Sequence, residues 1–74
     1  MTVILKKKYI GKYYARFSSY INTKGEVMYV ADLNEMVGGE YQLVNIRKIN
    51  DRKKCQNTYH YYCHKAKKLM EETR

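Results

Sequence analysis

Residues 12–21, KYYARFSSYI, alternate between two sets of side chains with the two-residue period of a β-strand. The set that we expect to face a core is Tyr13, Ala15, Phe17 and Ser19. The set that we expect on an exposed face is Tyr14, Arg16, Ser18 and Tyr20. The loop Asn22-Thr23-Lys24-Gly25 follows, and its glycine can adopt the left-handed conformation that closes a hairpin. This stretch therefore predicts a sheet with one buried and one open face.

Segments on both sides of this hairpin also have strand character. Val3 to Tyr9 is rich in β-branched and aromatic residues, and its run Lys6–Lys8 is typical of a sheet edge. Glu26 to Ala31 is expected to be the returning strand, and Tyr41 to Ile49 a further one. Between them, Asp32-Leu33-Asn34-Glu35 matches a capping box before the glycines Gly38-Gly39. This predicts either a single helical turn or a longer strand that turns at the glycines, and the pattern does not separate the two.

The C-terminal segment has the periodicity of an amphipathic helix. Its apolar stripe is Tyr59, Tyr62, Cys63, Ala66, Leu69 and Met70, and the opposite side carries Tyr61, Lys65, Lys68 and Glu72. We expect Asn57 or Thr58 to cap this helix. The predicted class is α+β: a three- to four-stranded, mostly antiparallel sheet with one C-terminal helix packed on one face. The whole chain, residues 1–74, is expected to form a single domain.

The size of the chain favours binding over catalysis. A domain of 74 residues buries only about 60% of the surface that its unfolded chain exposes, so few residues remain for a shielded catalytic cavity. Nine tyrosines supply rings that suit half-buried contact surfaces. We therefore expect a protein that is not an enzyme and binds a partner on its outer surface.

The charge indicates what kind of partner that is. The formal net charge is +8, which favours nucleic acid, an anionic membrane or an acidic protein surface. The charges are unevenly distributed: residues 1–24 hold six bases and no acid, residues 25–46 four acids and no base, and residues 47–68 eight bases and one acid. Folding can gather such segments onto one face. The alternative interpretation is that the charge serves only solubility.

Two cysteines, Cys55 and Cys63, are expected to be free thiols in a reducing compartment. The N-terminus lacks the apolar segment of a signal peptide, and no apolar run approaches the ~20 residues of a membrane span. A cytoplasmic location is therefore expected.

The histidines and cysteines do not predict a metal site or a catalytic group. His60, Cys63 and His64 share one side of the helix, with Cys55 just upstream, but no second element supplies further ligands. A thiol nucleophile would also need a third group to orient its base, and the sequence supplies none. We expect no metal and no cofactor.

Two clusters are candidate binding surfaces. The first is the exposed strand face, Tyr14, Arg16, Ser18 and Tyr20, with Lys12 and Lys24 at its ends. Its guanidinium can pair with a phosphate or a guanine, and its rings can stack on bases. The second cluster is Arg47, Lys48, Arg52, Lys53 and Lys54, which suits phosphate contact. For both clusters the alternative is an ordinary solvent-exposed surface.

Residues 11–30, which contain GKYYARFS and then NTKG, resemble the arm-type DNA-binding domains at the N-terminus of phage and transposon tyrosine integrases. The resemblance implies a sheet laid in the major groove and backed by a C-terminal helix, with Tyr14, Arg16, Ser18 and Lys24 facing the groove. The chain departs from the family's pattern after residue 30, where it inserts the acidic segment 32–40 and another strand. In size and charge it is also similar to small phage proteins that inhibit host machinery, including anti-CRISPR proteins.

Together these observations predict a small nucleic-acid-binding module for DNA or RNA, which uses the exposed sheet face and basic loops. The alternative is a phage-encoded inhibitor that binds a host protein or ribonucleoprotein. A third possibility, a small RNA-cleaving toxin, needs a catalytic group that the sequence does not supply.

Overall fold

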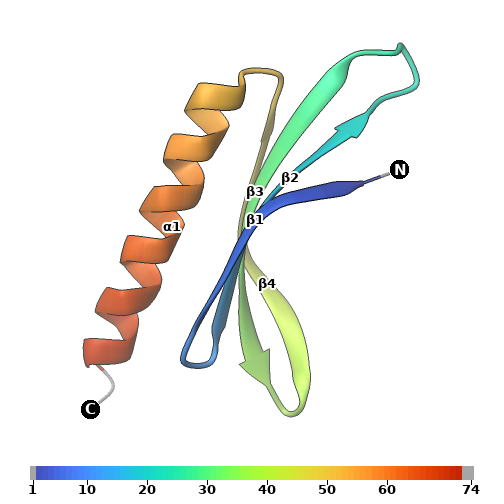
Figure 1. Ribbon diagram of the computed structural model, residues 1–74. Helices are drawn as coiled ribbons and strands as arrows, with labels where there is room; N and C mark the ends of the chain where they lie inside the picture. Colours follow the sequence, from blue (N-terminus) through green and yellow to red (C-terminus); the bar gives the residue numbers. More distant parts are fainter. Residues whose placement is uncertain (1, 73–74) are drawn as a thin grey trace.

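A single helix packs across one face of a four-stranded antiparallel sheet in the computed structural model, which describes residues 2–72 (Figure 1). The strands are β1 (Val3–Ile10), β2 (Tyr13–Ile21), β3 (Val27–Val37) and β4 (Glu40–Ile49), and the helix is α1 (Arg52–Glu72). The sheet order is β1-β2-β3-β4, so each strand pairs with its neighbour in sequence and β1 and β4 form the two edges. The predicted α+β class and the C-terminal helix are confirmed.

The segment Asp32–Glu35 is strand and not a helical turn. β3 continues without a break to Val37, and the chain then reverses through Gly38 (φ 60°) and Gly39 (φ 88°). Positive φ at two successive residues is what a two-residue hairpin turn of type I′ requires, and glycine adopts it without strain. The longer-strand alternative is therefore confirmed, and the capping-box interpretation is wrong because these residues pair in register with β2.

The core lies between the sheet and α1, as the alternation in residues 12–21 predicts. Tyr13, Ala15 and Phe17 of β2 are buried there, and Ser19 is half-buried. β3 adds Ala31 and Leu33, both fully buried. The helix contributes Cys55, Tyr59, Tyr62, Cys63 and Ala66, with Leu69 and Met70 partly buried beside them. The predicted apolar stripe is confirmed, and Cys55 extends it by one turn toward the N-terminus.

The helix begins earlier than expected. It starts at Arg52, and Asp51 is its cap: Oδ1 of Asp51 accepts a hydrogen bond from the backbone N–H of Lys54 at 3.0 Å. The predicted caps Asn57 and Thr58 are wrong, because Cys55 packs in the core and holds the preceding turn in helical form. The residues Arg52, Lys53 and Lys54 are thus helical and not part of a loop.

Cys55 and Cys63 are free thiols, as predicted, and both are buried. Burial raises the pKa of the Cys55 thiol, an effect that the nearby charge of Arg47 opposes. Within residues 2–72, no helix has the length and apolar character needed to span a membrane.

Candidate nucleic-acid interface

A groove of about 640 Å³ runs between α1 and the edge strand β4. We call it the basic groove; its lining residues are Asn45, Arg47, Lys54, Asn57, Thr58, Tyr61, Tyr62 and Lys65. On β4, Asn45 and Arg47 pair with Leu33 and Ala31, so they share the face that α1 covers. On α1, Lys54, Thr58, Tyr61 and Lys65 follow one another at spacings of four, three and four residues, which places them along one side of the helix.

Neutral partners hold two of the three cations in place. Nη1 of Arg47 donates to Oγ1 of Thr58 at 2.9 Å, and that hydroxyl donates in turn to the backbone carbonyl of Lys54 at 3.1 Å. Nζ of Lys65 donates to Oδ1 of Asn45 at 2.9 Å. These bonds position the cationic groups across the groove and leave their charge uncompensated. The positions are pre-organised for an anion, which reduces the entropy lost on binding.

Among the described residues, none with a carboxylate lines the basic groove. In the described part of the chain, the ion pairs are Lys12 with Glu35 and Arg16 with Asp32, each at 2.9 Å. Lys12 immediately precedes β2, Arg16 lies on β2, and both acids lie on β3. A third acid, Asp51, is engaged as the helix cap. The first turn of α1, which contains Lys54, holds no acidic residue. The groove is therefore a concentrated positive surface whose charges are free to pair with a polyanion.

Tyr61 gives the groove an aromatic wall. Its side chain is 62% exposed, and its ring lies 5.9 Å from that of the buried Tyr62 in a tilted arrangement. Burial is the main cause that raises the pKa of Tyr62. An exposed ring beside cations can stack on a base or pack on a sugar while the cations contact phosphates.

The strand face predicted from residues 12–21 lies where expected, but not all of its side chains are exposed. The side chains of Tyr14, Arg16, Ser18 and Tyr20 do lie on the face away from α1, but Ser18 is buried, at 3% exposed. Its neighbours in register, Ile4 of β1 and Val30 of β3, flank its small side chain. The expectation that Ser18 is exposed is wrong, because the larger neighbours of a serine shield it in a sheet.

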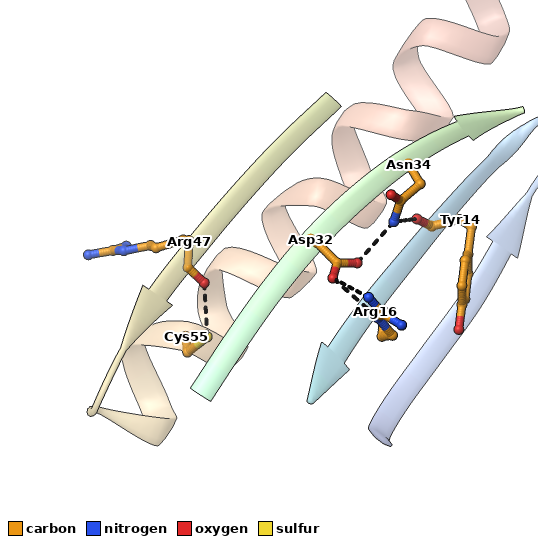
Figure 2. Close-up of polar contacts among 6 residues, drawn as sticks. All are labelled: Tyr14, Arg16, Asp32, Asn34, Arg47 and Cys55. Atoms are coloured by element: carbon orange, nitrogen blue, oxygen red, sulfur yellow. Dashed lines mark hydrogen bonds and ion pairs between the residues drawn. The ribbon is translucent and has the colours of Figure 1, made fainter. Parts of the chain in front are cut away.

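Arg16 on this face forms an ion pair with Asp32 of the same chain (Figure 2). Its Nε and Nη2 donate to Oδ2 of Asp32 at 3.2 and 2.9 Å, and Nδ2 of Asn34 donates to the other carboxylate oxygen at 3.0 Å. The hydrogen bond to Asp32 is the main cause that raises the pKa of Arg16. One donor edge of the guanidinium is thus committed to a carboxylate that is only 2% exposed. A phosphate would have to compete with it.

The remaining predicted residues are dispersed. Lys12 pairs with Glu35, and that hydrogen bond is the main cause that raises the pKa of Lys12. Lys24 is exposed in the β2–β3 turn, and Tyr20 is half-buried. Lys48 and Tyr20 line a smaller pocket of about 360 Å³ on the face away from α1, together with Arg16 and Asp32.

Of the second predicted cluster, the fold brings only Arg47 and Lys54 into the basic groove. Lys48 follows Arg47 on β4 and so points to the other face, while Arg52 and Lys53 are exposed in the first turn of α1. Lys65 and Tyr61 were expected only on the outer side of the helix. The helical spacing from Lys54 to Lys65 is visible in the sequence, but nothing in it shows that β4 lies alongside.

The histidines and cysteines do not come together. His60 and His64 are exposed on α1 while Cys55 and Cys63 are buried. No group of three His, Cys, Asp or Glu side chains within residues 2–72 is arranged to hold a metal ion.

Comparisons of the chain with protein-family models, with curated proteins and with solved structures gave no significant match.

Proposed function

We propose that this protein binds nucleic acid through the basic groove, where Arg47, Lys54 and Lys65 contact backbone phosphates. The observation that supports the proposal is the convergence of three cations on one groove, which no carboxylate of residues 2–72 lines. The net charge of +8 adds a long-range field of the same sign, which steers polyanions toward the protein.

Each residue has a role that follows from its chemistry. The guanidinium of Arg47 can present its free donors to phosphate oxygens, while Lys54 and Lys65 act as point charges. Tyr61 supplies a ring for a sugar or a base. Phosphate contacts give affinity and orientation but little sequence information, so this groove suits binding that tolerates many sequences.

The salt dependence of binding tests the proposal. Contacts to three phosphates through the groove would give a slope of log K against log salt of about −2 to −3, before any contribution from other lysines. We would measure the binding of labelled single-stranded and duplex oligonucleotides by fluorescence anisotropy over a salt series.

The decisive comparison is between two double variants that remove the same charge. Arg47→Gln/Lys65→Gln removes two of the three charges of the groove, whereas Lys67→Gln/Lys68→Gln neutralises two exposed lysines of α1 that do not line it. The groove variant should lower the salt slope by about 2 and weaken binding at least tenfold, and the control should have a clearly smaller effect. Circular dichroism would confirm that both variants are folded. Equal effects of the two variants, or no binding at low salt, would refute the proposal.

A further inference from the structure

A cluster of tyrosine rings lies on the face of the sheet away from α1, which we call the open face. Tyr9 of β1 is opposite Tyr14 of β2 in register, and their rings are stacked with centroids 4.6 Å apart and planes within 9°. Tyr41 of β4 lies 5.5 Å from Tyr14 with its ring tilted by 52°. We call these three residues the tyrosine platform. Three different strands contribute to it, so it exists only in the folded sheet.

The fold leaves the platform uncovered. Tyr9 is 60% exposed and Tyr41 is 44% exposed, while Tyr14 is half-buried between them. Loss of water around its hydroxyl is the main cause that raises the pKa of Tyr14. Leu43 and Ile46, which follow Tyr41 on β4, are also exposed on this face. Exposed aromatic and apolar side chains gathered on one face in this way indicate a contact site.

The charges on the open face favour an anionic partner. Register places one acid on this face, Asp32, and Arg16 neutralises it. Lys7 is opposite Arg16, and Lys48 is opposite Val30, so both belong to the open face. Neither lysine has a carboxylate within ion-pair distance in the described part of the chain. The face therefore combines exposed rings with unpaired cations.

We propose that the tyrosine platform stacks the unpaired bases of single-stranded nucleic acid, with Lys7 and Lys48 contacting its phosphates. This rests on the proposed function and specifies its ligand: single strands bind more tightly than duplex. The physical reason is that bases inside a duplex are already stacked on each other, so an exposed tyrosine ring can reach their faces only in a single strand.

The basic groove and the open face lie on the two sides of β4. β4 is an edge strand, and its consecutive residues Arg47 and Lys48 point to opposite faces, one into the basic groove and one onto the open face. No other strand separates the two surfaces at that edge in the described sheet. A flexible single strand can bend around this edge, whereas a stiff duplex cannot.

The test uses a pair of matched variants of the full chain. Tyr9→Leu/Tyr41→Leu removes the two exposed rings, and Tyr9→Phe/Tyr41→Phe keeps the rings and removes only the hydroxyls. We would measure the affinity of each for a labelled oligothymidine and for a mixed-sequence duplex, with circular dichroism to verify folding. The leucine variant should lose about five- to 100-fold in affinity for the single strand, and the phenylalanine variant less than about twofold. Affinity for the duplex should change less than about twofold in both.

Four other outcomes would overturn the inference. Equal affinity of the unmodified chain for duplex and single strand, or leucine and phenylalanine variants that bind the single strand alike, would leave the basic groove as the binding site and reject the platform. Self-association of the unmodified chain in sedimentation, abolished by the leucine variant while single-strand binding persists, would identify the platform as a protein contact instead. Absence of binding to either nucleic acid would reject the proposed function itself.

Discussion

Arg16 and Asp32 face each other across β2 and β3, and Nη2 of the arginine lies 2.9 Å from Oδ2 of the aspartate. The pair lies on the open face of the sheet, yet Asp32 is only 2% exposed. Asn34 donates a further hydrogen bond to the same carboxylate and reaches the backbone carbonyl of Tyr14 at 3.4 Å. Asp32 of the acidic segment thus neutralises Arg16 of the basic segment within the sheet.

Removal of Arg16 should destabilise the fold, because Arg16 neutralises a carboxylate that is almost fully buried. Arg16→Ala leaves the nearly buried Asp32 carboxylate without its cation, which should cost about 2–4 kcal/mol in the free energy of unfolding. Denaturant titration measures this cost. Asp32→Ala in the Arg16→Ala background should recover part of it, because the uncompensated charge is gone. Additive effects of the two changes would contradict the pairing.

The start of the helix gives a second prediction. Asp51→Ala removes the acceptor for the backbone N–H of Lys54 and should cost about 1 kcal/mol in stability. Asn57→Ala is the matched control, since Asn57 is exposed inside the helix and should change stability by less than about 0.5 kcal/mol. Thermal and denaturant unfolding would measure both. A larger effect at Asn57 would place the start of the helix later than the structure does.

Two glycine substitutions separate backbone strain from packing. Gly11 and Gly25 both have positive φ, at 56° and 80°, so alanine should cost about 1 kcal/mol at either site. A Cβ at Gly25 meets open space, whereas at Gly11 it would collide with the end of the Met70 side chain. Gly11→Ala should therefore be the more destabilising change in denaturant titrations. Equal costs would show that Met70 moves aside freely.

Tyr59 predicts a loss of stability at alkaline pH. Burial, followed by hydrogen bonding and charge at Cys63, raises the pKa of Tyr59 to about 12. The folded state therefore keeps this proton between pH 10 and about 12, where the unfolded chain releases it, so stability falls as the pH rises above 10. The total loss from this group is about 2–3 kcal/mol.

The variant Tyr59→Phe should reduce that fall, measured as the change in denaturation midpoint between about pH 9 and pH 11.5. Tyr62→Phe is a useful comparison because burial also raises the pKa of Tyr62. An unchanged pH dependence in Tyr59→Phe would show that its hydroxyl ionises without cost to the fold.

Local periodicity made much of the fold predictable. The alternation of residues 12–21 identified Tyr13, Ala15 and Phe17 as core, and the three- and four-residue spacing of the C-terminal segment identified the helix stripe. These patterns are sufficient because the direction of a side chain relative to its own strand or helix depends on near neighbours only. The bounds of β1, β2 and β4 also agree closely, since glycine marks each turn between strands, whereas β3 continues past the expected end at Ala31 to Val37.

The ambiguity at Asp32–Glu35 shows that local sequence patterns do not always distinguish a helical turn from a strand. A capping box and a strand are both compatible with those four residues, and pairing with β2 decided between them. Likewise, the sequence around Cys55 did not predict that this residue is fully buried. Its burial accompanies a helix that begins at Arg52, earlier than expected.

By itself, the sequence determined the class of fold, the core face of β2, the buried side of α1 and a strong positive charge. The tertiary structure alone decided that Arg16 is engaged with Asp32, 16 residues away, and that Arg47 meets Thr58 while Asn45 meets Lys65 across a groove. Side chains of distant residues become neighbours only through strand register and the placement of the helix. Both are set by burial of the whole core rather than by any one segment.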